Sequence, residues 1–162
     1  MKYLGSAVIG TLSSLLAFCL WAAADSDAGF IRITPDQVAF QGTSGLQQSV
    51  LFGDPAKPGI YVVRVKFPPG VHSNPHFHSQ DRHVTVIKGV WLMGVGEQLD
   101  IRKAVPMKSG SYALHPAGAV HWDGAGDEET IVQITGMGPV KTTQVDPQKA
   151  PTGIWTVPKG AD

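Results

Sequence analysis

Short apolar runs rich in β-branched residues recur along the chain from residue 25 onward, and clusters of Gly and Pro separate them. No stretch carries apolar residues at the 3.6-residue spacing of a long amphipathic helix. Runs of this length predict β-strands, and the Gly and Pro clusters between them predict turns. The predicted strands cover residues 48–52, 60–67, 83–88, 90–95, 111–114, 119–122 and 129–135. The pattern therefore predicts an all-β protein.

Many short antiparallel strands avoid exposed edges when they close on themselves, and a double-sheet jelly roll closes around a small cavity. We expect such a jelly-roll barrel here. The flanking segments 25–38 and 145–162, the second of which is rich in Pro and Gly, are predicted to be irregular arms that wrap the barrel. A flexible tail is the alternative. Trp155 and Ile154 favour docking, because burying a large apolar side chain stabilises a fold by roughly 1.5–3 kcal/mol.

The first 24 residues have the composition of a secretory signal peptide: Lys2 near the start, an apolar run over residues 4–21, and three alanines at 22–24. Cleavage is expected after Ala24, which leaves one domain over residues 25–162. A retained membrane anchor is the alternative, although polar residues interrupt the run. The only cysteine, Cys19, lies inside this segment, so the exported chain is expected to carry no disulfide. Phe18 before it argues against lipid attachment at Cys19.

Charge excludes one class of partner. The chain has 13 basic and 13 acidic residues, and removal of Lys2 leaves 12 against 13, a net charge of about −1 with neutral histidines. No basic stripe is present, whereas nucleic-acid binding requires clustered Lys and Arg to neutralise phosphates. We therefore expect neither nucleic-acid binding nor, after cleavage of the signal, membrane binding.

Two segments place histidines at regular spacing from glycines: Gly70-x5-His76-x-His78-x3-Arg82-x6-Gly89 and Gly110-x5-Pro116-x-Gly118-x2-His121. On an extended segment His76 and His78 project to the same face, because side chains alternate along a strand. A third imidazole from a distant strand, that of His121, would complete a set of nitrogen ligands. Such a set suits iron, copper, nickel or zinc and leaves coordination positions open.

These two segments resemble the two sequence motifs of the cupin superfamily of small β-barrels. The resemblance implies a jelly-roll fold and metal ligands at His76, His78 and His121, and it also implies a homodimer. The family usually has a glutamate ligand where this chain has Arg82, and a guanidinium cannot bind a cation. The remaining three-histidine set resembles that of cupin thiol and diketone dioxygenases. Arg82 would then bind a carboxylate of an anionic substrate in the same cavity.

Two alternatives to the three-histidine site follow from the missing glutamate. His83 or Asp81 would supply a fourth ligand if a bulge shifted the strand, because His83 has the opposite strand parity. In the other alternative Arg82 fills the cavity as a hydrogen-bonded cation and no metal binds, although burying it beside three histidines is unfavourable without a compensating anion.

The remaining motif residues are interpreted structurally. His72 is expected in a loop, at the surface or behind the ligands, and His115 in a turn with its ring half exposed. The four motif glycines are expected to adopt positive φ. Core or cavity-lining positions are expected for four large residues: Phe77, Trp91, Met93 and Trp122.

The sequence favours an exported metalloenzyme of the non-haem dioxygenase type acting on a small anionic organic substrate. Iron is the expected metal, with Mn, Ni, Cu or Zn as alternatives, and Arg82 is the expected catalytic residue. The competing function is a non-catalytic binding protein or sensor that holds a small anion in the same cavity. No general base beyond His83 and His115 stands out, which favours direct metal chemistry or simple binding over hydrolysis.

Overall fold

The structure is a computed structural model that describes residues 29–42 and 45–155. The chain divides into two units, residues 1–32 and 33–162. In the first unit, the described residues 29–32 are exposed, and the Arg32 guanidinium lies 5.7 Å from the centre of the Phe30 ring. The predicted signal peptide lies outside the described residues. Within the described part of the chain, no helix is long and apolar enough to cross a membrane.

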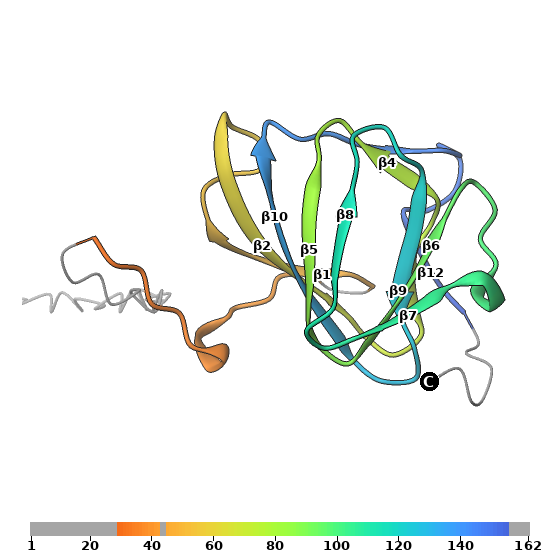
Figure 1. The fold of residues 1–162 in the computed structure, drawn as a ribbon, viewed down its shortest axis with the longest axis horizontal. Helices are drawn as coiled ribbons and strands as arrows, with labels where there is room; N and C mark the ends of the chain where they lie inside the picture. Colours follow the sequence, from red (N-terminus) through yellow and green to blue (C-terminus); the bar gives the residue numbers. More distant parts are fainter. Residues whose placement is uncertain (1–28, 43–44, 156–162) are drawn as a thin grey trace, which may run out of the picture. The chain divides into compact units, whose positions relative to one another are not determined.

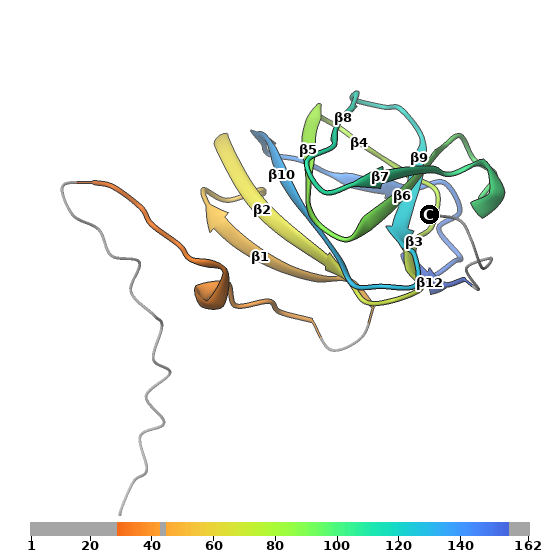
Figure 2. The ribbon, with the colours of Figure 1, turned by 60° about the horizontal axis from the view of Figure 1, so that its bottom comes forward.

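The second unit is built from two antiparallel sheets (Figure 1). The five-stranded sheet has the order β1 (Gln47–Phe52), β2 (Gly59–Phe67), β10 (Thr130–Gly138), β5 (Arg82–Lys88), β8 (Tyr112–His115). The seven-stranded sheet has the order β11 (Thr142–Gln144), β4 (His76–His78), β9 (His121–Ala125), β3 (Val71–Ser73), β12 (Thr152–Ile154), and it also contains β6 (Val90–Val95) and β7 (Val105–Lys108). Figure 2 shows β1, β2 and β10 on one side of the barrel and β9, β3 and β12 on the other. The predicted all-β jelly roll is confirmed.

The core lies between the sheets and follows the alternation of side chains along each strand. On β2 and β10, Val63 is paired with Ile134, and both side chains are buried. On β5, Val84 pairs with the same Ile134, so three strands contribute neighbouring apolar side chains to one layer. The buried cluster consists of Tyr61, Val63, Phe67, Val84, Val86, Trp91, Ala125, Val132 and Ile134. In the described residues Cys is absent, so packing of this kind stabilises the barrel without disulfides.

All seven predicted strands are present, and β6 has the predicted bounds. The largest boundary errors are at β9, which begins at His121 and continues to Ala125, and at β10, which continues to Gly138. The strands β3, β4, β7, β11 and β12 were not in the predicted set. Each has only three or four residues, too few for a period-two pattern to stand out. The motif glycines adopt positive φ as predicted: Gly70, Gly89, Gly110 and Gly118.

Two short strands, β3 and β4, pair with the same edge of β9, one after the other along its length. His76 pairs with His121 near the start of β9, and His72 pairs with Gly124 near its end. The break between β3 and β4 is held by the C-terminal segment, because the Asn74 backbone N–H donates to Pro151 O and its side chain donates to Ala150 O. This arrangement aims the histidines of β4 and β9 at the same point in the barrel.

The described part of the C-terminal arm docks on this sheet. Trp155 stacks on His72 with ring centres 4.7 Å apart, and its Nε1 donates to Ala125 O at 2.8 Å. Ile154 was also expected to dock, but it is 81% exposed because its side chain points away from the sheet on β12. At the other end of the second unit, a 3-10 helix over Pro35–Gln37 contains no buried residue.

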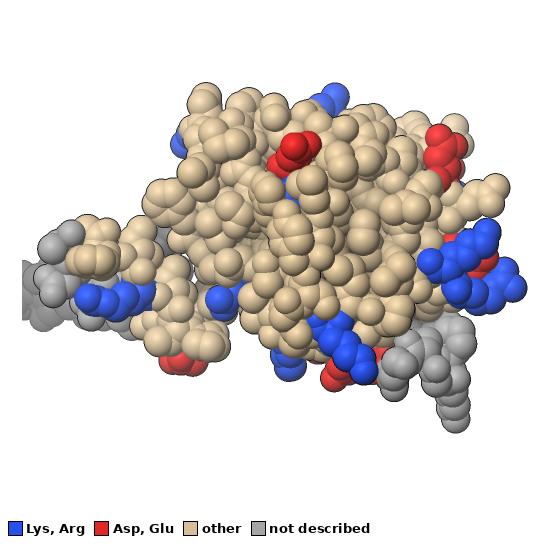
Figure 3. All heavy atoms as spheres, in the orientation of Figure 1, with Lys and Arg blue, Asp and Glu red and all other residues tan. Residues whose placement is uncertain are grey.

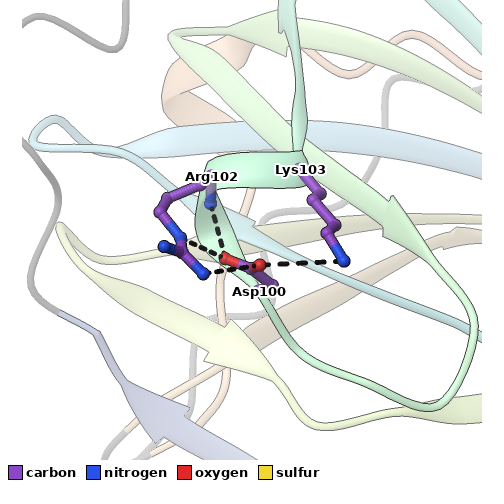
Figure 4. A network of polar contacts seen from close by, with 3 residues as sticks. All are labelled: Asp100, Arg102 and Lys103. Carbon is purple, nitrogen blue, oxygen red and sulfur yellow. Dashed lines mark hydrogen bonds and ion pairs between the residues drawn. The ribbon is translucent and has the colours of Figure 1, made fainter.

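Charged side chains are dispersed over the face of the barrel that Figure 3 shows. On the face in Figure 3, acidic side chains lie beside many of the Lys and Arg side chains, and wide areas carry no charge. One polar network lies between β6 and β7, where Asp100 accepts hydrogen bonds from Arg102 Nε at 2.9 Å and Nη2 at 3.0 Å, with Lys103 Nζ 3.9 Å away (Figure 4). Both basic side chains are largely exposed, so these pairs contribute little stability.

Candidate metal centre

The three predicted ligands meet inside the barrel. His76 and His78 lie on one face of β4, and His121 is the direct cross-strand partner of His76 on β9. The His76 ring centre lies 4.8 Å from that of His78 and 4.4 Å from that of His121. All three side chains are buried, and their ligand atoms lie within 4.8 Å of one another. The structure therefore brings these three histidines together as the sequence motifs predict.

Hydrogen bonds fix the orientation of two of these rings. His76 Nδ1 lies 2.7 Å from Asn74 O, and His121 Nδ1 lies 3.0 Å from Ala119 O. A carbonyl oxygen only accepts, so each Nδ1 must carry the proton and donate it. Each Nε2 then has a free lone pair directed away from the backbone, which is the tautomer that binds metal through Nε2.

Arg82 lies beside His78. It lies on β5 opposite His115 of β8 and Gly136 of β10, and its Nη1 approaches His78 Nε2 at 2.5 Å. Because a guanidinium can only donate, His78 Nε2 accepts, and His78 Nδ1 donates to the Thr142 hydroxyl at 3.0 Å. His78 thus has the same tautomer as the other two histidines, but its Nε2 lone pair is engaged by Arg82.

His115 belongs to this cluster, and its predicted position in a half-exposed turn was wrong. It is the last residue of β8 and only 3% exposed. Its ring centre lies 3.8 Å from that of His121 and 5.5 Å from that of Trp91. Pro116 does begin the turn, but the residue before a proline favours an extended backbone, which lets β8 continue through His115.

Asp123 is a functional candidate that the sequence reasoning missed. It follows His121 by two residues on β9 and therefore projects to the same face. Its carboxylate accepts a hydrogen bond from the Ser73 hydroxyl on β3, and only 8% of the residue is exposed. Asp123 has the same strand parity as His121, just as His76 and His78 share one, but the predicted strand ended at Trp122 and so did not include it.

Two groups of potential metal ligands result, and they share one residue. The first is His76, His78 and His121, and the second is His115, His121 and Asp123. Within the described residues, His121 Nε2 and both ring nitrogens of His115 are buried without a hydrogen-bond partner. Unpaired buried nitrogens cost free energy unless a ligand or metal satisfies them, so the donor set fits a transition metal.

The electrostatics of the cluster keep three of its imidazoles neutral: those of His78, His115 and His121. Burial, reinforced by Arg82 and neighbouring histidines, lowers the pKa of His78. Burial, together with His121, lowers the pKa of His115 to about 3, and burial also lowers the pKa of His121. Near neutral pH these rings therefore have lone pairs available without losing a proton.

Asp123 and Arg82 carry the opposing charges of the cluster. Burial acts to raise the pKa of Asp123, but the surrounding histidines and the Ser73 hydrogen bond outweigh it, so the pKa is lowered and the carboxylate is ionised. Burial lowers the pKa of Arg82, although Tyr61 and Asp123 favour its charged form. The guanidinium keeps its charge at neutral pH because its ordinary pKa is so high.

The two candidate replacement ligands, His83 and Asp81, lie elsewhere, and His72 also lies outside both ligand groups. His83 is exposed on the outer face of β5, where its Nδ1 lies 2.8 Å from the Tyr112 hydroxyl. Asp81 is exposed and accepts a hydrogen bond from the Ala117 backbone N–H at 2.7 Å. His72 was expected in a loop, but it lies in β3, is buried beneath Trp155 and is in neither ligand group. The structure thus places neither His83 nor Asp81 where it could replace the missing glutamate.

Sequence comparison assigns the family. Residues 30–141 match the ChrR cupin-like domain family, so this chain belongs to that cupin family. A comparison with curated protein sequences gave no significant match. The family assignment agrees with the two histidine motifs and with the jelly-roll fold.

Solved structures share the fold at low sequence identity. KdgF from Halomonas sp. is 20% identical with a TM-score of 0.53, over 65% of this chain and 92% of that one. The polyketide cyclase RemF from Streptomyces resistomycificus is 15% identical with a TM-score of 0.58, over 73% and 88%. The cupin-2 domain protein Rru_A2000 from Rhodospirillum rubrum is 17% identical with a TM-score of 0.57, over 72% and 80%. These likenesses support the cupin fold.

Proposed function

We propose that this chain is a metal-dependent cupin that binds one divalent transition metal at the cluster around His121 and acts on a small anionic organic molecule. The observation that carries the proposal is the convergence of buried imidazoles in the barrel. The Nδ1 atoms of His76 and His121 are hydrogen-bonded to backbone carbonyls, and His121 Nε2 has no hydrogen-bond partner among the described residues. His76, His78 and His121 form the ligand set that the family resemblance implies. Iron is the proposed metal, and a bound iron would supply the dioxygen chemistry of a non-haem dioxygenase.

Arg82 is the proposed catalytic residue because it places a fork of N–H donors inside the cluster. Its Nε is buried without a hydrogen-bond partner in the described residues, so the guanidinium has unused donor capacity. A carboxylate is the acceptor that matches this geometry, through two parallel hydrogen bonds. Binding of such an anion would draw Arg82 away from His78 Nε2 and release that lone pair for the metal.

Metal analysis of the purified protein tests this function. Plasma mass spectrometry of protein prepared without tag or chelator is expected to show about one metal ion per chain, with His121→Ala as the metal-free control, because His121 belongs to both ligand groups. Oxygen consumption is then measured with small organic acids and diketones. A folded wild-type protein that binds none of iron, manganese, nickel, copper or zinc contradicts the proposal.

A non-catalytic binding protein is the second candidate, and one contact favours it. Arg82 Nη1 lies 2.5 Å from His78 Nε2, so the positive charge of this guanidinium would repel a metal ion bound by His76, His78 and His121. In that case Arg82 would hold a small anion with no reaction. Calorimetric binding of a small carboxylate without oxygen consumption would support this candidate over the enzyme.

We also propose that the protein is exported. The composition of residues 1–24 supports it, since the segment has a charged start, an apolar centre and a small-residue exit. Intact mass measurement of the protein recovered from outside the cytoplasm is expected to give a chain that begins at Asp25. Recovery of the full-length chain bound to the membrane would contradict cleavage.

A further inference from the structure

His115, His121 and Asp123 form a compact group of buried ligands beside the predicted one. Their ligand atoms lie within 4.8 Å of one another, and the three residues are 3%, 3% and 8% exposed. They come from the end of β8 and from one face of β9, so two adjoining regions of the barrel wall fix their positions. The group offers two imidazoles and one carboxylate.

The imidazole donors of this group have nitrogens that are free to bind. In the described part of the chain, both nitrogens of His115 and Nε2 of His121 are buried without a hydrogen-bond partner. The His115 ring is held in place by packing, with ring centres 5.5 Å from Trp91 and 3.8 Å from His121. A buried imidazole with neither nitrogen satisfied is unfavourable, and a metal ion would relieve that cost.

The three-histidine group, formed by His76, His78 and His121, attracts a cation less strongly than this second group. Arg82 Nη1 engages His78 Nε2 at 2.5 Å and places a positive charge next to one of its three donors. Asp123 instead places a negative charge among the donors of the second group, which attracts a cation in this buried environment. His121 has a single free nitrogen, so it can serve only one of the two groups at a time.

We propose that His115, His121 and Asp123 form a metal site that holds a divalent transition metal without His78, and that Asp123 supplies the carboxylate missing from the first motif. This inference rests on the proposed function, because it requires a metal at the cluster, but it assigns different ligands. Two imidazoles and a carboxylate suit iron(II) or zinc and leave positions open for other ligands. The Ser73 hydroxyl orients the carboxylate from behind.

Cobalt(II) is a suitable probe, since its visible absorption reports its ligands and its binding can be titrated without turnover. The site is tested with His78→Ala, Asp123→Asn and the double variant. His83→Ala and Asp127→Asn are matched controls, because both residues are exposed. His78→Ala is expected to retain about one cobalt per chain with less than a threefold change in Kd. Asp123→Asn is expected to weaken binding at least tenfold, and the double variant is expected to lose it.

Four outcomes decide between the ligand sets. Loss of cobalt in His78→Ala, with wild-type binding in Asp123→Asn, would overturn the inference and leave the three-histidine site intact. Absence of cobalt binding in the wild-type protein would overturn both this inference and the three-histidine site. If Asp123→Asn does not fold, as judged by circular dichroism, His115→Gln replaces it, and a tenfold loss supports the site. An unchanged Kd in folded His115→Gln overturns it.

Discussion

The guanidinium of Arg82 lies against the imidazole of His78, with Nη1 2.5 Å from Nε2. Arg82 stands where cupins usually have a glutamate ligand, so a cation replaces an anion at the centre of the barrel. A bound metal and Arg82 would repel each other across a buried, weakly screened distance. If the proposed metal binds, the balance between this repulsion and the ligand donors would set how tightly it is held.

Removing this positive charge should strengthen metal binding. We expect Arg82→Gln to lower the Kd for cobalt(II) by about tenfold, equivalent to about 1.4 kcal/mol, because the cationic neighbour of His78 is lost. Competition with a chelator of known affinity measures the change. Arg102→Gln, which removes an exposed arginine, is the control and should leave Kd unchanged. A weaker Kd in Arg82→Gln would show that the guanidinium supports the site.

His121 should be indispensable for metal binding, whichever ligand group holds the ion. His121→Ala removes the one donor that both groups share, so the bound metal should fall from about one per chain to background. Plasma mass spectrometry of the purified variant makes the measurement. His83→Ala is the matched control, because this exposed histidine contacts Tyr112 outside the cluster. Full metal occupancy in His121→Ala would exclude both ligand groups.

The sequence predicted the fold and the first ligand group because both depend on local spacing. Alternation along strands identified β2, β5 and β10, and the motif spacing placed His76, His78 and His121 correctly. His115 and Asp123 were missed for different reasons. The proline after His115 suggested a turn, and the predicted strand ended at Trp122, one residue before Asp123. Their proximity depends on how β8 and β9 meet in the closed barrel, which no local pattern specifies.

Gly94 should tolerate no side chain. A Cβ atom at this position would lie 2.0 Å from the Trp122 ring, which is itself buried. We expect Gly94→Ala to reduce the free energy of unfolding by about 3 kcal/mol, since overpacking forces rigid neighbours to move. Urea denaturation provides the measurement. Gly126→Ala is the control, because a Cβ there meets no atom within 4 Å. Equal stability of the two variants would contradict the close approach of the Gly94 backbone to the Trp122 ring.

The metal-free protein should lose stability as the pH falls below 6.5. Burial and His121 lower the pKa of His115 from 6.5 to about 3, with Asp123, Arg82 and His76 also facing the ring. Between these two values the unfolded state binds a proton that the native state does not. The free energy of unfolding therefore decreases towards acid by up to about 1.4 kcal/mol per pH unit for this group.

Urea denaturation of chelator-treated protein between pH 7 and 5 checks this slope. His78 and His121 contribute in the same direction, because burial also lowers their pKa values. His115→Gln should therefore have a shallower pH dependence than the wild type but should retain part of it. Identical slopes in the two proteins would show that His115 is not buried in its neutral form.

Trp155 should hold the C-terminal segment against the sheet that carries the candidate metal ligands. Its indole stacks on His72 at 4.7 Å and donates to Ala125 O, the last residue of the strand that carries His121 and Asp123. Two glycines permit this approach: a Cβ at Gly124 would lie 2.7 Å from the Trp155 ring, and one at Gly153 would lie 2.7 Å from the His72 ring. We expect Trp155→Ala to cost about 2 kcal/mol of unfolding free energy, less than for a fully buried tryptophan.

The adjacent residue provides the control for this prediction. Ile154 is 81% exposed, so Ile154→Ala should change the free energy of unfolding by less than about 0.5 kcal/mol. Both variants are compared by urea denaturation followed by far-ultraviolet circular dichroism, which does not depend on tryptophan fluorescence. A Trp155→Ala variant as stable as Ile154→Ala would mean that β3 and β9 hold their positions without the indole. A selective loss would instead show that the C-terminal segment supports the strand on which the shared ligand His121 lies.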